Sequence, residues 1–149
     1  MQTLADRRGW SPFMAQQIEF SLAERTVEHK LIPMAAGVGL SVLPWSPLGG
    51  SLLSGTYSRA NVAQSRNPDV SVTRKGVIAS SGHLTEHALA TVEAVQTVAR
   101  QTGAMPSQMA PAWTLTNLAV ASPVMDARTV AQAGEDLCAL GLGLSPEQV

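Results

Sequence analysis

The order strand–helix–strand near the start of the chain is the feature that most restricts its fold. Residues 15–21 are rich in apolar side chains, with Ile18 and Phe20 in alternation, and predict a strand. Residues 24–37 predict a helix, because apolar side chains recur at helical spacing along it and just after it: Val27, Leu31, Met34, Ala35 and Val38. The apolar run 40–44 predicts a second strand. Two strands joined by one helix form a βαβ unit, so we expect parallel, neighbouring strands.

Short-range signals mark both ends of this predicted helix. Ser21 followed by Glu24 fits a capping box, in which the two side chains satisfy backbone N–H groups at a helix start. Gly37 and Gly39 end the helix with the residue type that tolerates a left-handed backbone.

A long irregular segment separates this unit from the next helix. Residues 50–84 contain Gly, Ser, Asn, Arg and Pro with little periodicity, and predict a long loop. Thr85 to Thr102 predicts a helix that Gly103 ends, with one apolar face formed by Ala88, Val92, Val95 and Ala99.

The last third predicts helix, strand and helix. Pro106 stands at the favoured first position of a helix that carries Met109, Trp113 and Leu115. Residues 119–124 predict a third strand, and residues 129–140 a final helix. We interpret Trp10 and Trp113 as packing residues.

The alternating order predicts an α/β fold with a parallel sheet. With 149 residues and 45% apolar composition, the chain can hold one domain, 1–149, with a substantial core. Three parallel strands leave faces and edges uncovered. We therefore expect a partial (β/α)₈ TIM barrel, roughly its last three βα units.

Composition excludes several classes of function. The net charge is −1 and the sequence has no basic stripe, so we expect no nucleic-acid partner. Cys138 is the only cysteine, which argues against a disulfide framework and a Cys-rich metal site. His83 and His87 enclose Glu86 in the wrong order for a His-Glu-x-x-His metal motif, so we expect no metal. No apolar stretch reaches membrane-spanning length and residues 1–9 lack a signal-peptide pattern, so we expect a cytoplasmic protein.

The segment after the second predicted strand carries the strongest binding signal. Trp45 offers a flat face for stacking, and Ser46 with the backbone N–H groups near Gly49 and Gly50 can approach anionic oxygens. Alternatives remain for single residues taken alone, because a tryptophan is more often a core residue. Arg128 alone fits a solvated surface arginine, and Gln17 alone fits a residue that satisfies a backbone group.

Three phrases in order resemble the carboxyl-terminal half of the aldo-keto reductases, over residues 10–149. They are Gln17-Ile18-Glu19-Phe20-Ser21, Trp45-Ser46-Pro47-Leu48-Gly49-Gly50 and Ala127-Arg128-Thr129. The resemblance implies a (β/α)₈ barrel and NADPH-dependent reduction of aldehydes or ketones.

The resemblance also implies a cofactor role for particular residues. It assigns Gln17 to the nicotinamide carboxamide and Trp45 to stacking on the nicotinamide ring. It assigns the pyrophosphate to a turn formed by Ser46, Pro47, Leu48 and Gly50. It places the adenosine 2′-phosphate and adenine beside Asp126, Arg128, Gln132, Glu135 and Asp136.

Departures from the family pattern weaken the expected activity. The family's Asp, Tyr, Lys and His tetrad belongs to the first half of the barrel, so we expect no catalytic residue here and no turnover by this chain alone. Tyr57 is the only tyrosine and follows the pyrophosphate turn. Thr56 stands where the family has a lysine, and Asp126 and Asp136 stand where it has glycine and asparagine. Pro111 interrupts a helix that the family keeps unbroken, and a helix-interior proline costs about 3 kcal/mol. The changes in charge imply an eroded affinity for NADP(H).

Two classes of function therefore stay open. The chain is either the cofactor-binding half of a reductase, which meets a carbonyl substrate only if the missing half is supplied, or a non-catalytic remnant or interaction module. In the second case, two copies can associate through their open barrel edges.

Overall fold

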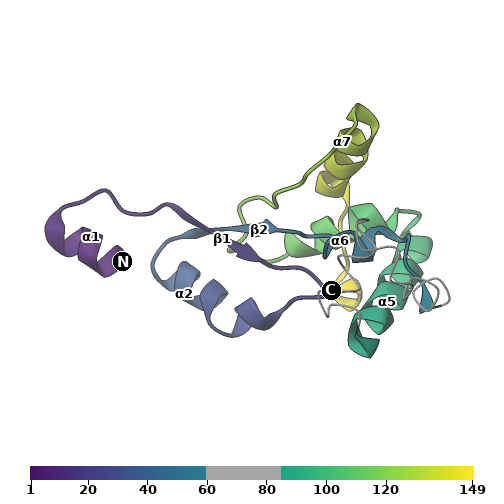
Figure 1. Cartoon of the computed structure of the whole chain (residues 1–149), viewed down its shortest axis with the longest axis horizontal. Helices are drawn as coiled ribbons and strands as arrows, with labels where there is room; N and C mark the ends of the chain where they lie inside the picture. The colour runs from purple at the N-terminus through teal and green to yellow at the C-terminus, as the bar shows by residue number, and fades with distance from the viewer. Residues whose placement is uncertain (60–84) are drawn as a thin grey trace, which may run out of the picture.

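The computed structural model describes residues 1–59 and 85–149, and shows a small α/β fold (Figure 1). Its helices and strands, in chain order, are α1 (Gln2–Arg8), β1 (Ala15–Glu19), η1 (Thr26–His29), α2 (Leu31–Gly37), β2 (Ser41–Trp45), η2 (Leu52–Ser54), α5 (Glu86–Thr102), α6 (Pro106–Thr114), α7 (Val130–Leu137), η4 (Cys138–Gly141) and η5 (Pro146–Gln148).

The predicted βαβ unit is confirmed at its strands. β1 and β2 pair in parallel, in a register that runs from Ala15 beside Ser41 to Glu19 beside Trp45. One face of this sheet packs against α2 and α6 through a cluster of buried apolar side chains, which we call the sheet cluster: Phe20, Ile32, Ala35, Val42 and Trp113. This packing fixes the position of Trp45, the last residue of β2.

The helix predicted over residues 24–37 is wrong as one continuous element. A 3₁₀-helix, η1, precedes α2, and Lys30 between them has a non-helical backbone with φ of −137°. Pro33 explains the break, because in a continuous helix its ring would clash with the carbonyl four residues earlier. With the break, Pro33 falls in the first turn of α2, where proline is tolerated.

The break also changes which side chains are buried. Ile32 and Ala35 are the buried residues of α2. Leu31, Met34 and Val38, which the helical spacing assigned to the buried face, are each more than 40% exposed. The predicted apolar stripe was therefore in the wrong phase for this helix.

The predicted capping box at Ser21 is also wrong. The backbones of Ser21 and Glu24 exchange two hydrogen bonds of 3.1 Å, so the segment is a tight turn rather than a helix start. The Oγ atom of Ser21 accepts hydrogen bonds from the N–H groups of Ala23 and Glu24 inside this turn. The short polar side chain therefore stabilises a turn instead of a helix.

Residues 119–124 run parallel to β2 without forming the third strand that the sequence predicts. The N–H of Val42 donates to the carbonyl of Ala119 at 2.8 Å, and the N–H of Ala121 donates back to Val42 at 2.9 Å. The two segments meet at two separate parallel bridges, between Val42 and Val120 and between Trp45 and Val124. The order of chain segments is thus as predicted, but the strand is incomplete.

Two prolines account for the incomplete strand. The next ladder bonds would need N–H groups from Pro44 and Pro123, and proline has none. The N–H of Val124 donates instead to the carbonyl of Pro44, at 2.7 Å. This segment therefore has one more residue than β2 between the two bridges, as in a β-bulge.

The helix pair α5 and α6 forms the other half of the core. The predicted apolar face of α5 is confirmed as buried, and Gly103 caps this helix with a φ of +71°. Thr85 accepts the N–H of Ala88 at its start. α6 begins at Pro106 as predicted and continues past Pro111, which is buried. Trp113 is confirmed as a packing residue, at 5% exposure.

The described part of the predicted loop 50–84 is partly ordered, whereas residues 60–84 lie outside the described residues. Leu52, Leu53 and Tyr57 are buried against α5 and α6. Arg59 forms ion pairs with Glu86 and with Glu93 of α5. These contacts attach the segment after β2 to α5.

Two elements project from the body. α1 lies at the end of an extended segment, apart from the sheet, and α7 points away from the rest of the molecule (Figure 1). Trp10, interpreted above as a packing residue, is 53% exposed, so that interpretation was wrong, and the Arg8 guanidinium lies 5.1 Å from its ring centroid. Among the helices of the described residues, none is long and apolar enough to cross a membrane.

Candidate functional site

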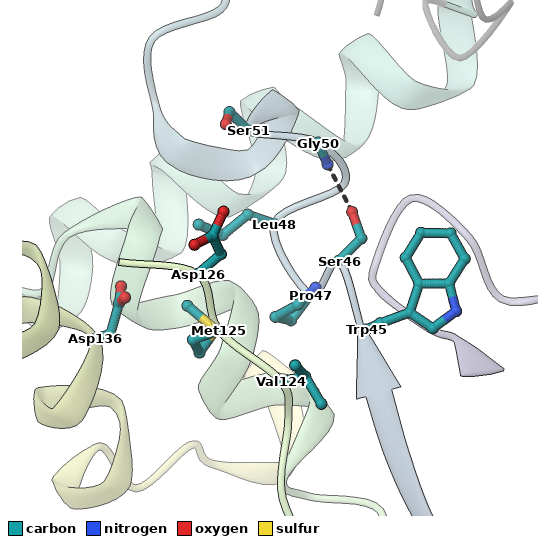
Figure 2. A pocket seen from close by; sticks show the side chains of 10 residues that line it. All are labelled: Trp45, Ser46, Pro47, Leu48, Gly50, Ser51, Val124, Met125, Asp126 and Asp136. Carbon is teal, nitrogen blue, oxygen red and sulfur yellow. Dashed lines mark hydrogen bonds between the residues drawn. The ribbon is translucent and has the colours of Figure 1, made fainter. Parts of the chain in front are cut away.

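A cavity of about 330 Å³ lies where β2 ends. The turn after β2 supplies one wall and the segment after the incomplete strand supplies another (Figure 2). Its described lining residues are Trp45, Ser46, Pro47, Leu48, Gly50, Ser51, Val124, Met125, Asp126 and Asp136. Since the carboxyl ends of parallel strands meet at one edge of a sheet, the cavity occupies the place where α/β proteins commonly bind ligands.

The turn from Ser46 to Ser51 is tightly wound. Four of its residues have positive φ, namely Ser46, Gly49, Gly50 and Ser51. Ser46 closes the turn, because its carbonyl accepts the N–H of Gly49 and its Oγ atom accepts the N–H of Gly50, each at 2.8 Å. The N–H groups that the sequence offered to an anion are therefore engaged within the turn.

Trp45 stands at the rim of the cavity. It is the last residue of β2 and 41% exposed, whereas Pro44 before it is buried, as strand alternation requires. In the view of Figure 2 the indole lies on the opposite side of the turn from Asp126 and Asp136. The flat ring and the two carboxylates thus occupy different ends of the lining.

Asp126 and Asp136 bring negative charge to the cavity wall. Asp126 follows the incomplete strand, and Asp136 is near the end of α7. Burial, and next the charge of Glu135, raise the pKa of Asp136 above its ordinary value. The Asp136 side chain is half-buried, which disfavours the charged carboxylate.

Four of the residues that the resemblance assigned to the cofactor lie outside this cavity. Arg128, Gln132 and Glu135 are exposed at and along α7. Their local bonds form a helix start, since the N–H of Arg128 donates to Oε1 of Gln132 at 2.9 Å and that of Gln132 donates to Thr129 Oγ1. Gln17 is exposed on β1, beside Leu43.

Sequence reasoning missed three lining residues, Ser51, Val124 and Met125. The junction between a strand and the following loop was the available signal, because ligand-contacting residues concentrate there. Among residues 1–59 and 85–149, no group of three His, Cys, Asp or Glu side chains lies close enough to hold a metal ion.

Comparison with known proteins identifies the family. The model of the "Aldo/keto reductase family" matches residues 1–149. The chain belongs to the aldo/keto reductase family. It is 30% identical over 146 residues, 98% of its length, to "Uncharacterized oxidoreductase YrpG" of Bacillus subtilis, covering 41% of that protein. It is 26% identical over its whole length to "Versiconal hemiacetal acetate reductase" of Aspergillus parasiticus, covering 42% of that protein. It is 30% identical over 91% of its length to "Probable voltage-gated potassium channel subunit beta" of rice (Oryza sativa subsp. japonica), covering 42%.

This aldo/keto reductase chain thus spans about two fifths of the length of the curated relatives it matches. The family resemblance seen in the sequence is confirmed over the whole chain. The relatives include proteins named as an oxidoreductase and a reductase, and one named as a channel subunit.

Proposed function

We propose that this chain supplies the cofactor-binding side of an NADP(H)-dependent oxidoreductase that acts on aldehydes or ketones. In this proposal the chain forms about the last three βα units of a (β/α)₈ barrel. The observation that carries the proposal is the cavity at the carboxyl end of β2, which brings Trp45 and the turn from Ser46 to Gly50 together with the segment 124–126.

The residues present fit the nicotinamide end of the cofactor. The parallel register sets Gln17 beside Leu43 and Glu19 beside Trp45, so Gln17 and Trp45 belong to the same face of the sheet. Both side chains are exposed. A flat ring stacked on Trp45 and the Gln17 amide would therefore lie on the same face of the sheet. This is the face that α2 does not cover.

The phosphate end fits less well. Ser46 already accepts the N–H groups of Gly49 and Gly50, and two carboxylates stand on the cavity wall. Arg128, the residue best suited to a phosphate, lies outside the cavity lining. We therefore propose that Ser46, Pro47, Leu48 and Gly50 shape the wall, and that the affinity for NADP(H) is weak.

The roles of the chain's own residues are binding and orientation. The cofactor, when bound, supplies hydride. Trp45 and Gln17 hold the plane of the reacting ring, and Pro47 and Leu48 exclude water from one side. Tyr57 is 3% exposed among the residues that pack against α5, so the chain's only tyrosine is not placed as a proton donor at the cavity. We propose that this chain alone does not turn over substrate.

Tryptophan-to-NADPH energy transfer tests this proposal. We expect a weak, saturable signal that Trp45→Leu abolishes and that the control Trp10→Leu, in the extended segment, retains. We also expect no oxidation of NADPH with a simple aldehyde. No saturable signal, or one that Trp45→Leu leaves unchanged, would overturn the binding proposal, and turnover above background would overturn the proposed inactivity.

A second candidate is a non-catalytic module that self-associates. Within the described residues no strand pairs with the outer edge of β1, and the preceding segment exposes Trp10, Phe13 and Met14. One relative is named as a channel subunit, and a subunit is by definition part of an assembly. Light scattering over a hundredfold concentration range tests this candidate, and a monomer throughout would exclude it.

A further inference from the structure

A second cavity, of about 360 Å³, lies between α6 and the end of the chain's last α-helix, α7. Its walls are mostly apolar. Pro111 and Leu115 contribute from the α6 side, and Ala133, Leu137 and Leu140 from the α7 side. A volume of this size suits a small organic molecule, since ligand cavities begin at about 300 Å³.

The α7 wall is incompletely covered by the rest of the molecule. α7 contains no buried residue, and Leu137 and Leu140 are 65% and 69% exposed. Both leucines line the cavity, so they present apolar surface both to the space and to solvent. A ligand with an apolar body would remove this surface from water, which is favourable at about 25 cal/mol per Å².

Asp136 is the ionisable side chain among the described lining residues of this cavity. Burial, and next the charge of Glu135, raise its pKa, because both disfavour the ionised carboxylate. A cation beside the carboxylate would offset this cost, whereas an anion would increase it. The cavity therefore combines apolar walls with a preference for positive charge at one point.

We propose that the cavity between α6 and α7 binds a small amphiphilic amine, with an aromatic or alkyl body against Leu137 and Leu140 and its ammonium group at Asp136. The binding of this ligand needs none of the residues Gln17, Trp45 or Ser46 and does not rest on the proposed oxidoreductase function. Asp136 and Met125 also line the cavity beside Trp45, so the two cavities share one wall.

Three matched probes test the proposal on the whole chain: 2-phenylethylamine, 2-phenylethanol and 3-phenylpropionate at pH 7. Their binding is followed by the methyl NMR signal of Met125 and by titration calorimetry. We expect the amine to bind at least fivefold more tightly than the alcohol, and the propionate to bind more weakly still. Equal affinities for the three probes, or no binding of the amine, would overturn the proposal.

Two pairs of variants locate the site. Asp136→Asn should reduce the amine's advantage over the alcohol to less than twofold, whereas Glu135→Gln removes the same charge from a neighbour outside the cavity lining and should retain the advantage. Ala133→Leu should narrow the cavity and weaken amine binding, whereas Ala131→Leu, on an exposed position of α7, should not. Circular dichroism verifies the fold of each variant.

The variants can also contradict the proposal. Retained preference for the amine in Asp136→Asn would place the ammonium elsewhere. An unchanged amine affinity in a folded Ala133→Leu would exclude this cavity. A Met125 shift that appears without probe as the protein concentration rises would show that a second copy covers the apolar walls, and would overturn the small-molecule assignment.

Discussion

The backbone N–H of Gly50 donates to the Oγ atom of Ser46 at 2.8 Å, across the turn that β2 delivers to the cavity (Figure 2). Ser46 therefore acts as an internal partner of the turn. The same contact holds two residues with positive φ, 55° at Ser46 and 66° at Gly50, in a fixed relation. This hydroxyl group is thus one of the contacts that hold the shape of this cavity wall, together with the Ser46 carbonyl that accepts the N–H of Gly49.

Ser46→Ala should destabilise the chain by about 1 kcal/mol, because it leaves the Gly50 N–H without its acceptor. Ser46→Gly loses the same hydrogen bond but relieves the positive φ, so its loss should be smaller. Urea unfolding followed by circular dichroism measures both variants. A larger loss for the glycine variant would show that relief of the positive φ does not decide the difference, and no loss in Ser46→Ala would show that the hydroxyl is not a stabilising group.

Gly55→Ala should be more destabilising than Gly103→Ala. Both glycines have positive φ, but a Cβ atom at Gly55 would lie 3.0 Å from Cγ of Pro106, whereas one at Gly103 meets no atom within 4 Å. We expect losses of about 2 and about 1 kcal/mol respectively. Thermal unfolding of the two variants checks the order, and equal losses would indicate that backbone strain alone decides the cost.

Arg59→Met should lower the melting temperature at low salt and have little effect in 1 M NaCl. The Arg59 guanidinium pairs with Glu86 and Glu93, and these hydrogen bonds raise its pKa. The pairs are exposed, so salt should screen them. Arg100→Met, which removes an arginine bonded to Thr97, is the matched control. An effect of Arg59→Met that persists at high salt would point to lost packing instead.

Asp136→Asn should stabilise the chain at pH 7 but not at pH 3. The pKa of Asp136 is raised above its ordinary 3.8, first by burial and then by Glu135. The folded chain then binds this proton more tightly than the unfolded chain, so stability falls as pH rises from 3.8 through the raised pKa. We expect a gain below about 1 kcal/mol at pH 7. Urea unfolding at both pH values, with Asp6→Asn as control, measures it, and equal gains at both would contradict the assignment.

The sequence predicted those helices and strands that are determined by apolar periodicity and by capping residues within the segment itself. The βαβ strands and the buried face of α5 follow from apolar periodicity, and Thr85 and Gly103 mark the ends of α5 as helix-capping rules require. The failures are equally local in origin. Pro33 divides the helix before β2, whereas the helix was predicted from the apolar spacing alone.

The candidate site was predictable only where its residues are consecutive in the sequence. Trp45 to Gly50 line one cavity because they are consecutive after a strand. Arg128 and Gln132 depend on how α7 packs, and that packing involves distant segments that no local pattern encodes. Asp136 lies on the same helix and does line the cavity. Membership of the same family motif therefore did not predict which of these residues would line it.

Two prolines, Pro44 within β2 and Pro123 in the segment that faces it, have a consequence for motion. Among the described residues, the segment from Pro123 to Asp126 attaches to β2 through one backbone hydrogen bond, from Val124 to Pro44, whereas Val42 holds the earlier part with two. Opening this one bond is a local event that leaves the pair β1 and β2 intact. Amide hydrogens should therefore exchange with solvent faster at Val124 than at Val42. The segment that forms this cavity wall can move away from β2 while the hydrogen bonds between β1 and β2 remain intact.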